Sequence, residues 1–309
     1  MFGLRQISDR VVGGENTMRN LFLIAAALAL MPGCTNLKEA TETSPTYDTE
    51  FPPALNELNF QSHGRRLNGL IYVAEGSGPH PTVLLLHGFP GNEKNLDLAQ
   101  DLRADGFNVL FFHYRGAWGS EGTFSFTHVI EDVAAATAFL RANAETYRTN
   151  PDKLILIGHS MGGFAALAAG AKDETIACTA GLAPANFGFV ANVLAADPDR
   201  KTGFIAYGDS LQMLAGTNGA SMVSELIDNR EAFDALTYAP NYAGRSVLIV
   251  GADKDEAVPL DAIIKPLIAA YEAEPDVDTT SAILSGDHSF SWSRDALIDT
   301  VLNWAEGCR

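Results

Sequence analysis

The sequence has few basic residues, and this shortage excludes one class of partner. It contains 21 lysines and arginines against 38 aspartates and glutamates, which gives a formal net charge of −17. Because no cluster of lysine or arginine interrupts this acidic background, the phosphates of a nucleic acid would be repelled. We therefore expect no nucleic-acid partner, and solubility is the simplest role of the negative charge.

Internal repeats are missing, and nothing in the composition is typical of a fibrous or largely disordered protein. A chain of 309 residues, 47% of them hydrophobic, is long enough to bury one large core. His113 ends a buried-strand pattern, but no carboxylates and histidines accompany it at the spacing of metal ligands. We expect one globular domain behind a leader segment, and no bound metal.

A hydrophobic run long enough to span a bilayer is missing from the N-terminal region. The apolar run 21–31 has the length of a signal-peptide core, and Cys34 follows a small residue, which resembles the bacterial lipoprotein signal. Acidic residues before Met18 are unusual in such a leader, so Met18 is an alternative start. We predict a signal peptide over 1–33 and export to the bacterial cell envelope. Lipidation of Cys34, which would tether the protein to a membrane on the periplasmic side, and ordinary secretion remain alternatives.

Cysteine is scarce as well, with three residues in the whole chain. If Cys34 is acylated, Cys178 and Cys308 remain, and they either pair in an oxidising compartment or stay free. Cys178 lies in a predicted buried strand and Cys308 at the extreme C-terminus. We expect an inert, buried Cys178 without a disulfide.

The rest of the chain alternates between short apolar runs and helical patterns. Residues 34–53 are rich in Thr, Glu, Ser and Pro, which predicts a solvated linker, and the catalytic domain is expected over 54–309. Strands are predicted at 55–60, 67–73, 82–86, 109–112, 154–157, 176–182, 247–250 and 282–284, and helices at 129–142, 164–171, 262–271 and 296–305. This alternation predicts an α/β fold with a mainly parallel central sheet flanked by helices.

One interval breaks the alternation. Residues 184–243 contain no strand-like run and include a helical stretch at 221–236. The interval is far longer than an ordinary loop. Because binding crevices lie at the carboxyl ends of the strands in open α/β sheets, we predict a small helical cap that roofs the active site and selects substrates.

The segment Gly158-His159-Ser160-Met161-Gly162 joins a predicted strand to a predicted helix. This placement puts a serine on the tight strand-to-helix turn typical of a nucleophile. Glycines suit such a turn because side chains would clash there and because glycine tolerates positive φ angles. Ser160 is therefore the predicted nucleophile, at a helix N-terminus that favours developing negative charge.

A serine nucleophile needs a histidine base and a carboxylate that orients the base. Of the seven histidines, His288 lies in a loop that follows the last predicted strand, on the same side of the sheet as Ser160. The carboxylate is expected in the loop after strand 247–250, where Asp253, Asp255 and Glu256 are the candidates.

An oxyanion hole is the third requirement. The turn His87-Gly88-Phe89-Pro90-Gly91 follows a predicted strand and exposes backbone amides, so we predict the N–H groups of Phe89 and Met161 as the donors. His87 is then expected to support this turn rather than to act as a base. Trp118 and Phe124 are candidates for the lining of the acyl pocket, although aromatic residues beside a core strand usually belong to the core.

Together these segments resemble the alpha/beta-hydrolase family. The resemblance rests on His-Gly-Phe-Pro-Gly at 87–91, Gly-His-Ser-Met-Gly-Gly at 158–163, Asp255 before Val-Pro, and His288, in the family's order of Ser, Asp and His. It covers residues 55–309 and implies an alpha/beta-hydrolase fold in which Asp255 is the acid of the triad. The segment 114–122, followed by Asp132, is similar to esterase-like and serine-peptidase-like members.

The predicted function is a serine hydrolase that cleaves a small acyl ester, like a carboxylesterase, through an acyl-enzyme intermediate. This chemistry needs no cofactor, and the predicted partner is a small-molecule acyl substrate. An aminopeptidase or acyl-peptidase acting on amide bonds is an alternative, for which an acidic group in the cap that binds an N-terminus would be diagnostic. A catalytically inactive hydrolase fold that serves as a binding module is an alternative from another class.

Overall fold

The computed structural model describes residues 46–309. The predicted signal peptide and Cys34 lie outside the described residues. The last residues of the predicted linker contact the body of the molecule, because the Asp48 N–H donates to the Glu75 carboxylate (2.6 Å) and Phe51 accepts a backbone hydrogen bond from Gly76 (2.9 Å). Within residues 46–309, no helix is both long enough and apolar enough to cross a membrane.

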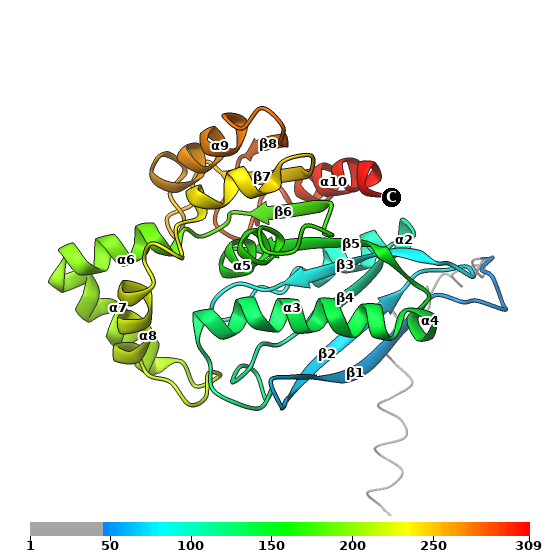
Figure 1. Cartoon of the computed structure of the whole chain (residues 1–309), viewed down its shortest axis with the longest axis horizontal. Coiled ribbons are helices and arrows are strands. Elements are labelled where there is room, and N and C mark those ends of the chain that lie inside the picture. The colour runs from blue at the N-terminus through cyan, green and yellow to red at the C-terminus, as the bar shows by residue number, and fades with distance from the viewer. Residues whose placement is uncertain (1–45) are drawn as a thin grey trace, which may run out of the picture. The chain divides into compact units, whose positions relative to one another are not determined.

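Eight strands form one sheet in the order β1-β2-β4-β3-β5-β6-β7-β8 (Figure 1). Their bounds are β1 Ala54–Ser62, β2 Arg65–Val73, β3 His80–Leu86, β4 Asn108–Phe112, β5 Thr149–His159, β6 Cys178–Leu182, β7 Ser246–Ala252 and β8 Asp278–Leu284. The pairs β1/β2 and β2/β4 are antiparallel, and all other pairs are parallel. The mainly parallel sheet and all eight predicted strands are thus confirmed.

Helices cover both faces of the sheet, and this explains the continuous apolar runs of the central strands. Helices α3 (Phe126–Ala142), α5 (Met161–Gly170) and α9 (Lys265–Glu272) pack on one face, and α2 (Leu96–Ala104) and α10 (Arg294–Ala305) pack on the other. A short helix α4 (Ala144–Tyr147) precedes β5, and a π-helical turn η2 (Leu260–Ile264) leads into α9. Helix α2 is absent from the sequence prediction, although Leu98 and Leu102 have helical spacing and are buried.

The segment between β6 and β7 contains no strand and consists of helices, as predicted. These are α6 (Phe187–Ala196), α7 (Pro198–Ser210), α8 (Gly219–Asp228) and the 3-10 helix η1 (Ala235–Tyr242), and α6–α8 lie together at one end of the molecule (Figure 1). The helix predicted at 221–236 is shorter than expected. It ends at Asp228 because the Asn229 side chain turns back to the Glu225 carbonyl (2.8 Å) and the chain then bends toward η1.

The cap is hydrogen-bonded to the segment that follows β4. The backbone N–H of Trp118 donates to the Met213 carbonyl oxygen (2.9 Å), and the backbone N–H of Ala215 donates to the Gly116 carbonyl oxygen (2.7 Å). On the neighbouring cap helix, the Glu225 carboxylate accepts the first two backbone N–H groups of α3 at 3.1 and 2.8 Å. A carboxylate at a helix N-terminus is favourably placed, so these contacts hold the cap against the body of the molecule.

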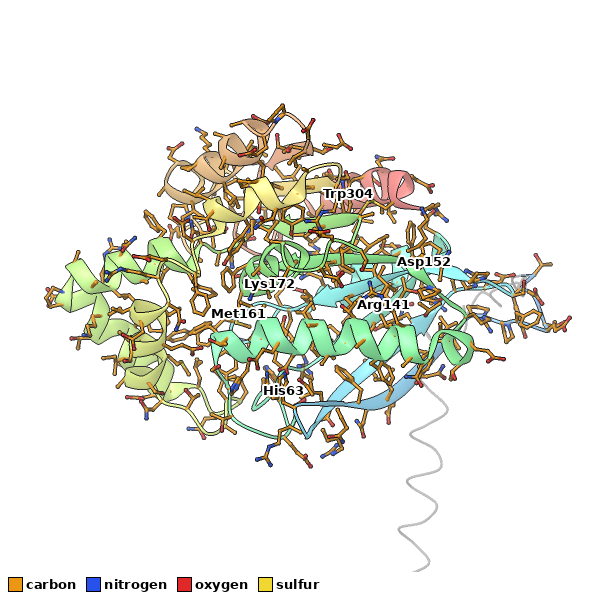
Figure 2. The ribbon with its side chains drawn as sticks, viewed as in Figure 1. His63, Arg141, Asp152, Met161, Lys172 and Trp304 are labelled. Carbon is orange, nitrogen blue, oxygen red and sulfur yellow. A yellow bond between two sulfur atoms is a disulfide. The ribbon has the colours of Figure 1, made fainter. Side chains whose placement is uncertain are left out.

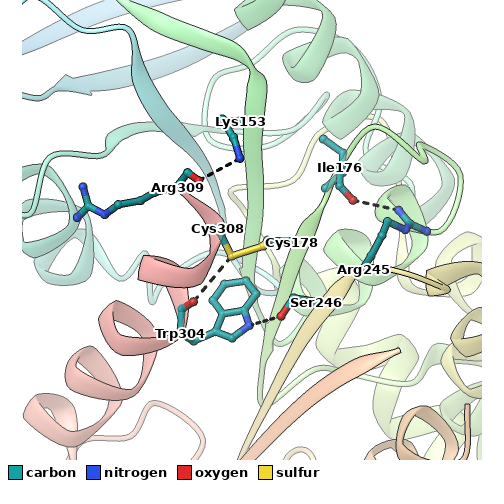
Figure 3. Close-up of a disulfide and its surroundings, with 8 residues drawn as sticks. All are labelled: Lys153, Ile176, Cys178, Arg245, Ser246, Trp304, Cys308 and Arg309. Carbon is teal, nitrogen blue, oxygen red and sulfur yellow. Dashed lines mark hydrogen bonds between the residues drawn. A yellow bond between two sulfur atoms is a disulfide. The ribbon is translucent and has the colours of Figure 1, made fainter. Parts of the chain in front are cut away.

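Cys178 and Cys308 form a disulfide (Figure 3). The expectation of an unpaired Cys178 is therefore wrong. The reason lies in the packing of α10, which brings the C-terminus beside the start of β6 so that the two Cα atoms are 6.1 Å apart, within the range that a disulfide allows. Nearby, the Trp304 indole N–H donates to the Ser246 hydroxyl (3.0 Å) and ties α10 to β7 (Figure 3).

Candidate active site

Ser160 lies between the end of β5 and the start of α5, in a strained backbone conformation. Its φ angle is 56°, which non-glycine residues rarely adopt. The Ser160 N–H donates to Leu182 at the end of β6 (2.9 Å) and thereby holds the turn against the sheet. Figure 2 shows Met161, the first residue of α5, on the side of the molecule that faces the cap.

The glycines that flank Ser160 are required for space rather than for positive φ angles. A Cβ atom added to Gly158 would lie 2.0 Å from the Gly162 carbonyl oxygen, and one added to Gly162 would lie 2.1 Å from the Leu86 carbonyl oxygen. Neither glycine has a positive φ, and the strained angle falls on Ser160 itself. The prediction that side chains would clash at these two positions is thus confirmed, whereas the prediction that the glycines adopt positive φ angles is wrong.

His288 is hydrogen-bonded to Asp255. The distance between His288 Nδ1 and Asp255 Oδ2 is 2.7 Å, and the Asp255 side chain has no exposed surface. Its other oxygen accepts the N–H groups of Ala257 and Val258, both at 2.8 Å. Since a carboxylate only accepts, His288 Nδ1 carries the proton and Nε2 is left to serve as a base. This arrangement is the one in which a carboxylate orients a histidine base.

The two other acidic candidates have different surroundings. Asp253 and Glu256 are exposed. The Asp253 carboxylate accepts the Gly286 N–H (3.0 Å) and so supports the loop that carries His288. Of the three candidates, Asp255, which the resemblance to the alpha/beta-hydrolase family selects, is the one that lies within hydrogen-bond distance of His288.

His159 also contacts the His288 loop, and sequence reasoning missed this. Its Nε2 lies 2.7 Å from the His288 carbonyl oxygen, so Nε2 carries the proton and donates. Burial, together with the nearby His288 charge, lowers the pKa of His159 to about 4. The imidazole is therefore neutral at pH 7, and it fixes the backbone of His288 from the position next to Ser160.

The turn after β3 passes directly beside Ser160. A Cβ atom added to Gly88 would lie 3.0 Å from the Ser160 Cβ, so this position has no room for a side chain. The next residue, Phe89, supplies one of the two predicted oxyanion donors. Met161, which supplies the other, begins α5, where backbone N–H groups lack helical partners. The two predicted donors therefore lie on segments that flank the serine.

His87 holds the peptide unit that contains the Phe89 N–H. Its Nδ1 donates to the Gly88 carbonyl oxygen (2.8 Å), which belongs to the same peptide unit. Its Nε2 accepts from His113 Nδ1 at 3.2 Å. Burial is the main reason that the pKa of His87 is lowered to about 3 and that of His113 to about 4. Both imidazole rings are thus neutral at pH 7, and they support the turn through these two hydrogen bonds.

A cavity of about 580 Å³ opens beside Ser160 and His288. Its walls come from the turn after β3, the cap and the segment after Asp255. Apart from Ser160, His288 and His159, they comprise the residues Gly88–Glu93, Ala185, Phe187, Val190, Phe204, Tyr207, Ala257, Val258, Ile263 and Ser289. The cap thus contributes an apolar and largely aromatic wall opposite the predicted catalytic residues.

Trp118 and Phe124 do not line this cavity, which corrects the sequence-based choice of pocket residues. Phe124 is buried behind Phe89, with the ring centres 5.7 Å apart. The Trp118 indole N–H donates to the Pro90 carbonyl (2.7 Å) and supports the turn from outside. The cap residues Phe187, Phe204 and Tyr207 line the cavity in place of the predicted residues. Sequence patterns could not select them, because which faces of the cap helices meet the cavity depends on how the cap packs on the body of the molecule.

A buried ion pair fixes the start of the segment 114–122. Asp132 on α3 accepts the Arg115 Nε–H (2.6 Å), the Arg115 backbone N–H (2.7 Å) and the Ser62 hydroxyl (2.6 Å). Both charged side chains are almost completely buried, and burial raises the pKa of Asp132. The segment that carries Trp118 is therefore anchored to α3 and, through Trp118, to the turn beside Ser160.

A family model and several known proteins are similar to this chain. A model of the Alpha/beta hydrolase family matches residues 83–300. The uncharacterized protein YfhR of Salmonella typhimurium is 29% identical over 232 residues, which cover 71% of this chain and 70% of YfhR. Esterase EstD of Thermotoga maritima is 29% identical over 140 residues, but these cover 40% of this chain and only 32% of EstD.

Among solved structures, Est1E from Butyrivibrio proteoclasticus is similar to this chain with a TM-score of 0.62 at 19% sequence identity. The superposition covers 82% of this chain and 98% of Est1E. Another structure of Est1E has ferulic acid bound. At this level of identity the likeness shows a shared fold.

Proposed function

The chain belongs to the alpha/beta hydrolase family, and on this basis we propose that it is a serine hydrolase that cleaves small carboxylic esters. The observation that carries the proposal is the 2.7 Å hydrogen bond between His288 Nδ1 and the fully buried Asp255 carboxylate, beside the cavity that Ser160 also lines. A histidine held in this way has one ring nitrogen free to accept a proton from serine.

In the proposed reaction, the Ser160 hydroxyl attacks the ester carbonyl carbon while His288 Nε2 removes the hydroxyl proton. The carbonyl oxygen becomes an oxyanion, and His288 then gives its proton to the departing alcohol. The acyl group remains on Ser160 as an ester. In the second half, His288 takes a proton from water, the resulting hydroxide attacks the acyl-enzyme, and the carboxylic acid leaves as Ser160 recovers its proton.

The N–H groups of Phe89 and Met161 are proposed to stabilise the oxyanion in both halves. The support for this role is the position of the two amides on the segments that flank Ser160, with the Gly88–Phe89 peptide held by His87. Donors that are fixed before the reaction stabilise developing charge without a cost of reorganisation. Asp255 stabilises the imidazolium that forms on His288 in each half.

The proposed substrates are esters of small, apolar or aromatic acids. The cavity of about 580 Å³ is of a size typical of small-molecule sites, and its cap wall is apolar and aromatic. Est1E, which shares the fold, has been solved with ferulic acid, an aromatic carboxylic acid, and EstD is named an esterase. These relatives support ester rather than amide substrates.

The peptidase alternative lacks the feature that would favour it. The cap residues that line the cavity are Ala185, Phe187, Val190, Phe204 and Tyr207, and none of these described residues carries a carboxylate. The acidic residue that the described lining does contain, Glu93, follows the turn after β3 and does not belong to the cap, so the cap itself does not supply the feature that would favour a peptidase.

The test is labelling of the protein and of its Ser160→Ala variant with a fluorophosphonate, together with hydrolysis of p-nitrophenyl esters of increasing chain length and of aminoacyl amides. We expect labelling that requires Ser160 and turnover of esters in preference to amides. Preferred turnover of amides would establish a peptidase instead. Absence of labelling in the wild type would establish the inactive binding module.

We further propose that the protein acts outside the cytoplasm, as an exported protein that is either secreted or tethered to a membrane through a lipidated Cys34. The disulfide between Cys178 and Cys308 supports export, because such bonds persist in oxidising compartments. Mass spectrometry of the mature N-terminus tests the proposal. A diacylglyceryl-modified Cys34 would establish the tether, whereas an unmodified N-terminus downstream of Cys34 would establish secretion.

A further inference from the structure

The catalytic cavity contains one carboxylate that the proposed mechanism does not use. Among the described residues that line the cavity, Glu93 is the only acidic one, and no lysine or arginine is among them. Glu93 follows the turn that carries the predicted oxyanion donor Phe89.

The neighbouring positive charges have other partners. Arg294 donates to the Asn95 side chain (2.9 Å) and to the Ser289 carbonyl (3.2 Å), and it is paired with the Asp97 carboxylate (2.6 Å). Lys94 Nζ lies 4.6 Å from the centre of the Trp118 ring, and Lys94 lines a different hollow together with His113. The chain as a whole carries a formal charge of −17, so the surrounding field does not oppose a cation. Glu93 thus lines a cavity in which no lysine or arginine is among the other described lining residues.

Glu93 is also held in position by its own loop. One carboxylate oxygen accepts the Asn95 N–H at 2.7 Å, and Asn95 is buried in a left-handed conformation at the start of α2. A carboxylate that the backbone already orients loses little freedom when it binds a ligand. Its second oxygen has no hydrogen-bond partner among the described residues and remains for a substrate.

Aromatic rings from the cap and the oxyanion turn share this cavity. Phe89 and Phe204 are stacked with ring centres 6.3 Å apart and an interplanar angle of 7°, and Tyr207 meets Phe89 edge to face at 6.0 Å. Tyr207 is 46% exposed, so part of its ring is open to a ligand. Ring faces attract cations, and aromatic residues recognise quaternary ammonium groups in this way.

From these two features we infer that the enzyme prefers substrates that carry a cationic ammonium group, and that Glu93 is the residue that determines this specificity. The inference rests on the proposed ester hydrolysis and narrows its substrate class. The cation lies against the aromatic rings and is attracted by the Glu93 carboxylate. For the same reason, esters with a negatively charged acyl or alcohol part are disfavoured.

The test compares two esters of identical shape that differ by one charge. Acetylcholine is paired with the acetate ester in which a carbon atom replaces the quaternary nitrogen. A second pair carries the trimethylammonium group, or its carbon counterpart, on the acyl side of a p-nitrophenyl ester. For each pair, the ratio of kcat/KM for the cationic ester to kcat/KM for the neutral ester is measured in the wild type and in Glu93→Gln.

Glu93→Gln is suited to this comparison because the glutamine side-chain oxygen can still accept the Asn95 N–H, so that only the charge is lost. We expect the wild type to prefer the cationic ester of at least one pair by about tenfold and Glu93→Gln to lose most of that preference. Tyr207→Leu, which changes a half-exposed ring, should lower the same ratio. The control is Glu174→Gln, which removes one charge at an exposed position outside the cavity and should leave the ratio unchanged.

A second measurement does not depend on turnover. Choline, but not its neutral carbon counterpart, should slow the fluorophosphonate labelling of Ser160, and Glu93→Gln should abolish this difference. Ratios near one in both pairs, or equal protection by the two alcohols, would overturn the inference while ester hydrolysis stands. Absence of Ser160 labelling would overturn the proposed function itself, and the inference with it.

Discussion

Breaking the disulfide between Cys178 and Cys308 should lower the stability of the folded protein by several kcal/mol. The bond joins residues 130 positions apart in the sequence. A cross-link that closes a loop of this length restricts the unfolded chain by about 5 kcal/mol at 25 °C in the chain-entropy model, and measured values usually fall below that figure. We therefore expect a loss of about 3–5 kcal/mol.

The folded state should nevertheless persist after the bond is broken. The Trp304 indole still donates to Ser246, Arg309 still pairs with Asp105, and Lys153 still donates to the C-terminal carbonyl. These contacts hold α10 and the C-terminus on the sheet without the covalent bond. The effect should thus appear as easier unfolding of a protein that is folded in buffer.

The assay is equilibrium unfolding in urea, with the oxidised protein, the reduced protein and the Cys308→Ser variant, all in a Cys34→Ser background. With a slope of about 3 kcal/mol per molar urea, a loss of about 4 kcal/mol moves the midpoint down by about 1.3 M. The reduced protein and Cys308→Ser should have similar midpoints. Two free thiols in the purified protein, or equal midpoints before and after reduction, would refute the reasoning.

Three further predictions concern the site and its support. Asp255→Asn should lower kcat for a p-nitrophenyl ester by about ten thousandfold, because His288 loses the partner that fixes its tautomer, and an unchanged kcat would remove Asp255 from the triad. Asp132→Ala should cost about 3 kcal/mol in urea unfolding, because the buried Arg115 loses this partner and keeps only its partly exposed partner Glu131. Burial lowers the pKa values of His87 and His159 to about 3 and about 4 from 6.5. The unfolded chain therefore binds more protons below pH 6.5, so stability falls as the pH drops from 6.5 to 4, by about 3 kcal/mol for His159 alone. In urea unfolding over that range, His159→Gln should weaken the dependence on pH, and an identical pH profile would contradict this origin.

Local sequence patterns were sufficient to predict the strands of the sheet, because each strand has a recognisable pattern of hydrophobic residues. Central strands such as β4 and β7 are buried on both faces and are therefore continuous apolar runs, which stand out from the helical periodicity between them. The tight turn at Ser160 also has a local signature, since its flanking glycines are required by contacts of about 2 Å within the turn and with the adjoining strand. Features with such short-range causes are visible in a sequence.

Other features depend on which distant segments meet. The pairing of Cys178 with Cys308, and the contact of Asp255 with His288, each join parts of the chain that only the order of the strands brings together. Trp118 was a pocket candidate as an aromatic residue beside a core strand, yet its indole N–H donates to the Pro90 carbonyl and supports the turn from outside the cavity.

The amino-acid sequence by itself determined the fold class, the order along the chain of the predicted catalytic segments, the predicted nucleophile and base, and the existence of a helical cap. Those properties follow from hydrophobic periodicity and from glycines in tight turns, which act over a few residues. The tertiary structure alone decided which cap side chains line the cavity, that Cys178 pairs with Cys308, and that Glu93 lines the same cavity as Phe204 and Tyr207. These depend on packing between segments far apart in the chain, where direction and distance are set by the whole core rather than by neighbouring residues.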